Sequence, residues 1–203
     1  MEYRESLMWK ELNAAPELLK TLKEKNSAVL DKIAKAVQGA KITNIYTAAR
    51  GTSDHAMIYF KYLAESLLGL PTASGAPSVF TMYGARMDLS HALTIGCSQS
   101  GKAADVMEVI KAGNESGGIT VAITNDAESP LAKLAQYHLC CCAGEEKSVA
   151  ATKTFSCQLF LAALLAEAMG GKAIADDIGE KLAAALPAID KATDAPAQAF
   201  LGA

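Results

Sequence analysis

Four consecutive residues in the middle of the chain, Ser98-Gln99-Ser100-Gly101, are of types that can bind an anion. The serines offer hydroxyl donors, and the glycine lets the backbone approach a ligand closely. Helical spacing of apolar residues begins at Lys102. Because the first amides of a helix lack partners within it, and because the helix dipole adds positive potential there, such a turn favours phosphate. The alternative is that Ser100 only caps the helix.

Two other stretches share this chemistry and also precede helices. One is Gly51-Thr52-Ser53, and the other runs from Glu146 to Thr154 and reads EKSVAATKT. Both are rich in small and hydroxyl-bearing residues. A single turn of this kind is common in proteins, whereas three of them at helix starts in one chain indicate a phosphate site more strongly.

The elements that must position these turns are alternating strands and helices. Short, mostly apolar runs predict buried strands at 42–49, 92–97, 119–124 and 137–142. Helical spacing is found at 5–38, 54–68, from 102 onward, at 129–134 and at 150–169, with a last amphipathic segment that ends before Pro187. At 78–83 the pattern leaves helix and strand open.

This alternation is typical of a parallel sheet that is covered on both faces and binds ligands beyond the carboxyl ends of its strands. We therefore expect an α/β fold, a three-layer αβα sandwich with a central, mostly parallel five-stranded sheet. Residues 1–39 are interpreted as an N-terminal helical segment, broken or restarted at Pro16, which packs on a main body of residues 40–203.

The composition argues against several classes of partner. The chain has 203 residues, 51% of them hydrophobic, and a net charge of −3. With a pI near 5.6 and no basic run, neither nucleic acid nor an anionic membrane is expected as a partner. Five cysteines, three of them consecutive and none in a CxxC spacing, are interpreted as core thiols of a cytoplasmic protein, with metal binding a poor alternative.

Together these motifs resemble the sugar isomerase (SIS) domain. The resemblance rests on GTSDHA at 51–56, SQSG at 98–101, AGEE at 143–146 and VAATKTF at 149–155. More narrowly, the chain is similar to the isomerase half of glucosamine-6-phosphate synthase and to SIS-type glucosamine-6-phosphate deaminases. The resemblance covers most of the chain, residues 7–190.

In that family the GTS and SQSG turns bind the phosphate of a hexose 6-phosphate. The resemblance implies the following phosphate-binding residues here: Thr52, Ser53, Ser98, Gln99 and Ser100. It also implies a set of sugar-binding residues: Gly51, Val149, Ala151, Thr152 and Lys153. Many relatives carry an acidic residue and a threonine where Lys102 and Ala103 stand, so one hydroxyl donor is missing here unless Lys102 folds back to supply charge.

The chemistry that the resemblance implies is interconversion of an aldose phosphate and a ketose phosphate, with ammonia released from a 2-amino sugar. No cofactor and no metal are expected. Glu146 is the best catalytic candidate for moving the proton, and a role in orienting the sugar or in loop structure is its alternative. His55, beside the GTS turn, is interpreted as a packed residue.

Enzymes of this kind carry two SIS domains in tandem, with catalytic groups in or after the second. We therefore expect this chain to be related to an aminosugar-phosphate isomerase or deaminase, and to bind hexose 6-phosphate rather than turn it over. A regulatory phosphosugar-binding module and a single-SIS isomerase with sites between subunits remain open. We also expect a homodimer, because apolar surface is otherwise left uncovered.

Overall fold

The structure of the chain is a computed structural model that describes the backbone of residues 3–201 and the side chains of residues 4–192. Four residues lie outside the described backbone: 1, 2, 202 and 203. They are the outer ends of the two segments expected at 1–39 and 40–203. The division of the chain at residue 39 stays a prediction.

The centre of the molecule is a five-stranded sheet in which every strand pair is parallel. The strands lie in the spatial order β2 (Thr72–Ser74), β1 (Asn44–Ala49), β3 (Ala92–Cys97), β4 (Ile119–Thr124) and β5 (Tyr137–Cys140). The expected α/β class and parallel sheet are therefore confirmed. The pattern predicted no strand at β2, because three residues are too few to show a period.

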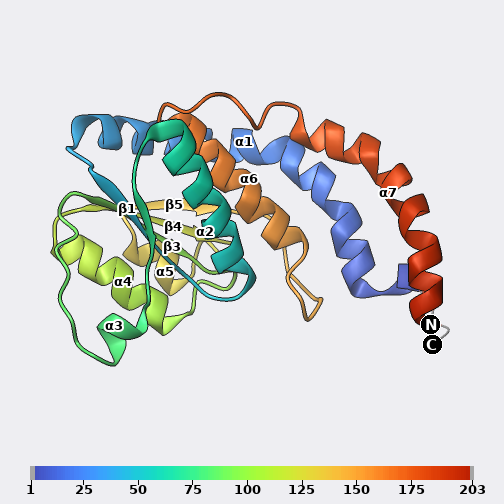
Figure 1. Cartoon of the computed structure of the whole chain (residues 1–203), viewed down its shortest axis with the longest axis horizontal. Coiled ribbons are helices and arrows are strands. Elements are labelled where there is room, and N and C mark those ends of the chain that lie inside the picture. The colour runs from blue at the N-terminus through green and yellow to red at the C-terminus, as the bar shows by residue number, and fades with distance from the viewer. Residues whose placement is uncertain (1–2, 202–203) are drawn as a thin grey trace.

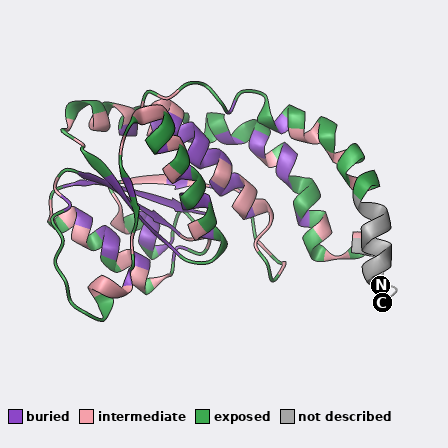
Figure 2. Ribbon diagram, viewed as in Figure 1, coloured by how far each residue is buried: buried purple, intermediate pink, exposed green. Residues whose placement is uncertain are grey.

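Helices cover both faces of the sheet and complete the expected three layers. On one face lie α1 (Leu7–Gly39), α2 (Thr52–Leu63) and α6 (Lys153–Ala168), and on the other lie α4 (Ala104–Glu115) and α5 (Pro130–Leu134). Figure 1 shows the sheet between these two helical layers, and Figure 2 shows its central strands β1, β3 and β4 almost entirely buried.

The core divides into two clusters because successive side chains of a strand point to opposite faces. Ile45 and Leu93 belong to the cluster under α1, α2 and α6, whereas Tyr46 and Ala92 belong to the cluster under α4 and α5. Parallel strands that are covered on both faces need apolar residues at nearly every position, which is why the strand segments were predictable from sequence.

The N-terminal helical segment is one long helix, α1, which we also call the lead-in helix. The break predicted at Pro16 is therefore wrong. Ser6 caps α1 by accepting a hydrogen bond from the Trp9 amide at 3.2 Å. A proline inside a helix removes one backbone hydrogen bond. Pro16 is buried together with Ala15 and Leu19, and the packing of α1 on α6 compensates for that loss.

A second proline is also accommodated within a helix. α7 (Ile178–Leu201) runs through Pro187, where the pattern predicted an end. It packs along α1, and Nη2 of Arg4 lies 2.9 Å from Oδ1 of Asp190. Figure 1 shows α7 beside the N-terminal part of α1, where both helices extend beyond the sheet.

Asn26, buried within α1, pairs with the outer edge of β5. Its side-chain amide donates to the carbonyl oxygen of Cys140 at 3.0 Å, and its side-chain oxygen accepts from the Cys140 amide at 2.9 Å. This pair of hydrogen bonds fixes the lead-in helix on the sheet.

The remaining elements are short. A 3₁₀ turn occupies Tyr3–Glu5, and a π-helical turn at Ala64–Leu68 extends α2. The undecided 78–83 stretch contains a helix, α3 (Ser78–Thr81). α5 begins as predicted, with Ser129 accepting a hydrogen bond from the Ala132 amide at 3.3 Å.

Candidate functional site

A cavity of about 460 Å³ opens at the carboxyl edge of the sheet, where β1 and β3 end. The strand order reverses at this point, since β2 lies on one side of β1 and β3 on the other. In doubly wound sheets with this strand order, ligands bind at the switch point. Eight of the predicted site residues line the cavity: Gly51, Thr52, Ser53, Ser98, Gln99, Ser100, Val149 and Ala151.

The turn after β1 forms the first wall. Gly51 has a φ of +55°, which side-chain-bearing residues rarely adopt, and α2 begins directly after it at Thr52. The helix thus starts two residues before the predicted Asp54, and its first turn lies at the cavity, where its dipole favours an anion. Ser53 is buried, and its Oγ accepts from Nε2 of Gln158 at 3.0 Å, which orients the hydroxyl.

The SQSG turn after β3 forms the second wall. Gly101 has a φ of +63°, and a Cβ at this position would lie 2.2 Å from the Ser129 Oγ. Only glycine therefore fits between this turn and the start of α5. The Leu131 amide donates to the Gly101 carbonyl oxygen at 3.1 Å and fixes the contact.

The interpretation of Ser100 as a helix cap is wrong, and so is the predicted helix start at Lys102. α4 begins at Ala104 because Ala103, its cap residue, is still extended. The Ser100 Oγ instead accepts from the Lys102 amide at 3.3 Å within the turn. Ser100 is exposed at the cavity, and Ala103 lines it where many relatives are expected to carry a threonine.

The third wall lies within the loop of residues 141–152, between β5 and α6. Val149, Ala150 and Ala151 line the cavity, and α6 begins at Lys153 rather than near residue 150 as predicted. Asn125 ties this loop to the SQSG turn. Its amide donates to the Gln99 carbonyl oxygen at 3.0 Å, and its side chain bonds to the backbone of residues 143 and 144 at 2.9 and 2.6 Å.

Glu146 is not among the described residues that line the cavity. Its carboxylate accepts from the backbone amides of Thr152 and Thr154 at 3.4 and 3.0 Å, and from both threonine hydroxyls. It thereby caps the first turn of α6, whose own cap residue makes no side-chain capping bond. Proton transfer by Glu146 stays a prediction, and this geometry favours its alternative, a role in loop structure.

Lys153 and Thr152 adjoin the third wall but are not among the described residues that line the cavity. The Lys153 Nζ donates to the Glu145 carbonyl oxygen at 2.6 Å and lies 3.3 Å from Oε1 of Glu11. A cation at a helix start is unfavourable, and the Glu11 carboxylate compensates for it. Contact of these two residues with a sugar stays a prediction.

Sequence reasoning missed Arg50, which also lines the cavity. Its Nε and Nη2 lie 2.7 and 2.6 Å from Oδ2 of Asp105 on α4, and its side chain is 62% exposed. A guanidinium presents a planar set of donors that suits phosphate. The signal was present in the sequence, since Arg50 stands between a strand and the Gly51 turn, but it was treated as part of the turn.

Cys97 contributes a buried thiol to the cavity lining. Burial raises the pKa of Cys97 to about 12, so the thiol stays neutral near pH 7. The five cysteines are free, with Cys97, Cys141 and Cys157 buried, as expected for core residues. Among the described residues, no group of three or more His, Cys, Asp or Glu side chains is placed to hold a metal ion.

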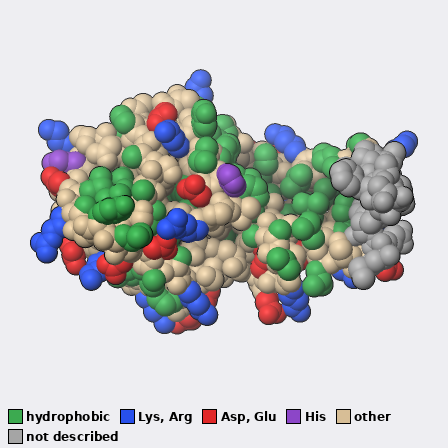
Figure 3. Space-filling model, turned by 60° about the horizontal axis from the view of Figure 1, so that its bottom comes forward, with side chains coloured by type: hydrophobic (Ala, Val, Ile, Leu, Met, Phe, Trp, Pro, Cys, Tyr) green, Lys and Arg blue, Asp and Glu red, His purple; other side chains and the backbone are tan. Residues whose placement is uncertain are grey.

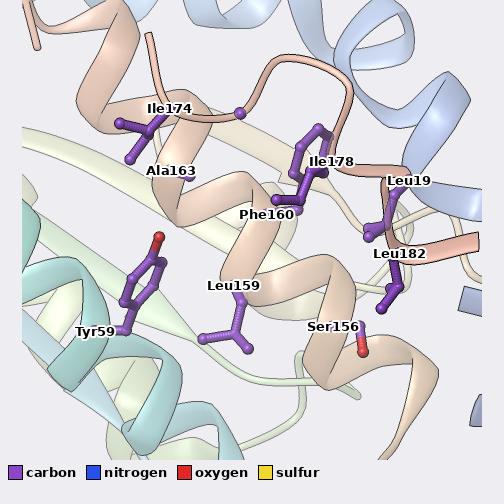
Figure 4. A pocket seen from close by; sticks show the side chains of 10 residues that line it. Leu19, Tyr59, Ser156, Leu159, Phe160, Ala163, Ile174, Ile178 and Leu182 are labelled. Atoms are coloured by element: carbon purple, nitrogen blue, oxygen red, sulfur yellow. The ribbon is translucent and has the colours of Figure 1, made fainter. Parts of the chain in front are cut away.

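A second cavity, of about 330 Å³, lies beside α6 and is mainly apolar. Figure 4 shows Leu19 and Leu182 at one end, with Tyr59 of α2 and Ile174 at the other. The ring of Phe160 lies beside Ile178 between them. The hydroxyls of Tyr59 and Ser156 are its only side-chain polar groups among the described lining residues. No predicted site residue lies among them.

The charged surface shows no sign preference on the face drawn in Figure 3, where Lys and Arg side chains are interspersed with Asp and Glu. This distribution agrees with the small net charge. In the part of the chain that the structure describes, no helix combines the length and the apolar character needed to cross a bilayer.

Comparison with known proteins places this architecture among phosphosugar proteins. The SIS domain family model matches residues 40–168. The isomerizing glutamine–fructose-6-phosphate aminotransferase of Methanothermobacter thermautotrophicus is 39% identical over 166 residues, which are 78% of this chain and 28% of that protein. The protein of the same name from Streptococcus pneumoniae is 36% identical over 169 residues, 80% of this chain and 28% of its own.

Among solved structures, a protein of Silicibacter pomeroyi DSS-3 assigned as a phosphosugar isomerase is similar to this chain, with a TM-score of 0.78 and 37% identity. The match covers 90% of this chain and 54% of that one. This chain therefore spans less than a third of the length of these curated relatives and about half of the solved one.

Proposed function

This chain belongs to the SIS domain family, and from that premise we propose that its sheet-edge cavity binds the phosphate of a hexose 6-phosphate. The observation that carries the proposal is the convergence of three turns, distant in sequence, on one cavity at the switch point of the sheet. A surface cavity formed by chance is not expected to bring these hydroxyl groups together beside the start of a helix.

The phosphate is held by complementary groups in this proposal. Ser98 and Ser100 donate from the SQSG turn, Thr52 and Ser53 from the start of α2, and Arg50 supplies positive charge. Arg50 also compensates for the hydroxyl donor that is absent at Ala103. The sugar then lies toward Val149 and Ala151 on the third wall.

The reaction class that we propose, as the one to which this chain is related, is interconversion of an aldose phosphate and a ketose phosphate, with ammonia released by hydrolysis if the substrate is a 2-amino sugar. The support is the similarity to isomerizing aminotransferases that act on fructose 6-phosphate by name. No cofactor enters this proposal, because the proton transfers require only an acid and a base.

A second candidate function is binding without turnover. Its support is Glu146, the best candidate for the proton carrier, whose oxygens are occupied by Thr152 and Thr154 outside the lining of the cavity. We therefore propose that this chain binds sugar phosphate, and that another domain or subunit supplies the groups that move protons.

Calorimetric titration with fructose 6-phosphate and glucosamine 6-phosphate tests the proposal, with ammonia release and sugar interconversion assayed on the same samples. We expect binding of at least one of the two, and an affinity about 100-fold weaker in the double variant Ser98→Ala, Ser100→Ala because two hydrogen bonds to a charged group are lost. Ser27→Ala, which removes a hydroxyl on the exposed side of α1, is the matched control.

The outcomes separate the two candidates. Binding without turnover supports the second, whereas turnover that survives in Glu146→Gln shows that another group moves the proton. If neither sugar phosphate binds, or if the Ser98, Ser100 double variant binds as well as the wild type, the phosphate assignment is wrong. Unphosphorylated fructose should not bind measurably in either case.

We also propose that two copies of the chain associate in the cytoplasm. The support for association is the exposure of Leu7, Met8 and Leu12 on α1, and the support for location is the set of five free thiols, which suits a reducing compartment. Sedimentation as a single monomeric species at micromolar concentration would contradict the dimer.

A further inference from the structure

Glu11 is a buried carboxylate in the second turn of α1, far in sequence from every residue of the cavity. Its side chain is only 9% exposed. A carboxylate that is buried to this extent requires partners for its oxygens, because an unpaired buried charge is strongly unfavourable. The identity of those partners indicates what the residue does.

Its partners belong to residues 146–153, at the start of α6 and in the loop just before it. Glu11 Oε1 accepts from the Lys147 amide at 2.7 Å, and Oε2 accepts from the Ser148 amide at 3.0 Å. The Nζ of Lys153 lies 3.3 Å from Oε1, and its side chain is only 11% exposed. Each carboxylate oxygen thus bonds to a different residue of the loop, which fixes both position and orientation.

These contacts fall immediately before the third wall of the cavity. Residues 147 and 148 precede Val149, Ala150 and Ala151, which line it. Residues 141–152 contain no helix or strand, so side-chain hydrogen bonds must hold the loop in place. Glu146 supplies such bonds from within the loop, whereas Asn125 and Glu11 supply them from outside. Val149 itself is fully exposed and has no packing that could fix it.

We infer that Glu11 is a positioning residue that clasps residues 147–153 from the lead-in helix and so holds the sugar-facing wall of the cavity. The inference deepens the proposed function and rests on it for the ligand, a hexose 6-phosphate. It makes α1 part of the binding machinery, although no residue of α1 is among the described residues that line the cavity.

Amide hydrogen exchange measured by NMR, together with fructose 6-phosphate titration, tests the inference in Glu11→Gln and Glu11→Ala. Glu11→Gln keeps the shape of the side chain but loses the charge and one acceptor. We expect the amides of Lys147 and Ser148 to exchange about tenfold faster in both variants, because each loses a hydrogen bond to a charged group. Affinity should fall about tenfold, since the ligand must then order the loop.

Asn26→Ala is the matched control, because Asn26 also fixes α1 but contacts β5 rather than the loop. It should lower the unfolding midpoint without changing exchange at residues 147 and 148 or the affinity of the folded protein. If Glu11→Ala fails to fold, Glu11→Gln alone tests the inference.

Unchanged exchange of both amides in Glu11→Gln, or equal effects of Asn26→Ala on exchange and affinity, would overturn the inference, since α1 would then act only through general stability. Failure of the wild type to bind hexose phosphates would instead overturn the proposed function. The exchange rates would still decide whether Glu11 positions the wall.

Discussion

Two cavities of this molecule are built from different materials. The cavity at the sheet edge is bounded by backbone turns that carry hydroxyls and one guanidinium, whereas the cavity beside α6 is bounded by apolar side chains of packed helices. The first lies where the strand order reverses, and the second lies within the helical layer. Under the proposed function, only the first of these two cavities binds a ligand.

The difference predicts how each region responds to substitution. Polar groups at the sheet edge add little to folding, because water can replace their partners, but they decide which ligand binds. Apolar groups beside α6 stabilise the fold through burial, and in the proposed function they contact no ligand. A substitution that lowered both the stability of the fold and the affinity for the ligand to the same extent would weaken the distinction.

Truncation of Phe160 is expected to have the largest effect. Phe160 is 7% exposed and belongs to the core cluster under the helices, so Phe160→Ala should destabilise the protein by about 4 kcal/mol. Affinity for fructose 6-phosphate in the folded protein should stay within about twofold of the wild type. Urea unfolding and calorimetry measure the two quantities, and a parallel loss of affinity would mean that the cavities are coupled.

Glu11 provides a pH-dependent test at the border between the two regions. Burial by itself raises its pKa, but hydrogen bonds from Ser148 and from the Lys147 amide outweigh burial and hold the pKa well below the ordinary value of 4.5. A lowered pKa in the folded state means that the stabilisation is fully present above pH 4.5 and is lost as the pH falls through the folded-state pKa.

Glu11→Gln should therefore be less stable than the wild type by about 2 kcal/mol at pH 7, and the difference should shrink steadily below about pH 4.5. Two charged groups face Glu11: Lys153 at the start of α6 and Glu146 on the loop before it. Urea unfolding at several pH values measures the difference. A gap that is constant down to pH 3, or that widens, would contradict this assignment of charge.

Substitution of Arg50 should affect the sheet-edge cavity alone. Arg50→Gln is expected to weaken hexose 6-phosphate binding about tenfold, equivalent to about 1.4 kcal/mol, with little change in stability because the side chain is 62% exposed. Asp105→Asn is the matched variant, since it releases the guanidinium and should preserve or strengthen binding. Equal losses in both variants would show that the ion pair matters only for structure.

Tyr59→Phe should have the smallest effect. Tyr59 is 38% exposed at the rim of the apolar cavity. Burial, with the nearby charge of Glu167, raises the pKa of its hydroxyl, which stays neutral near pH 7. Loss of the hydroxyl should change the free energy of unfolding by less than about 0.5 kcal/mol. A larger change in a thermal melt would reveal a polar role for this cavity.

Sequence reasoning succeeded where local pattern and local chemistry coincide. The GTS and SQSG turns follow buried strands, so the parallel-sheet rule was enough to predict that Ser53 and Ser98 share one edge. Pro16 shows the limit of such rules, because a local preference against helix was outweighed by packing on α6. That packing depends on residues more than a hundred positions away.

Glu11 and Gln158 could not be assigned from pattern for the same reason. Glu11 is a lone acid on a helix until the fold brings residues 147 and 148 to it, and Gln158 is one polar residue of an apolar helix until Ser53 lies beside it. Lys153 shows the converse case. Its position in a motif suggested contact with a sugar, whereas its described partners are protein groups.

The hydrogen bonds between Asn26 and Cys140 have a consequence for solubility. β5 is an outer strand of the sheet, and an outer strand offers unpaired amides and carbonyls to which other chains can add. Asn26 occupies one donor and one acceptor of that edge with a side chain instead of a further strand. The opposite edge, β2, is only three residues long. The lead-in helix thus protects the sheet against aggregation by strand addition on the side where the edge is longer.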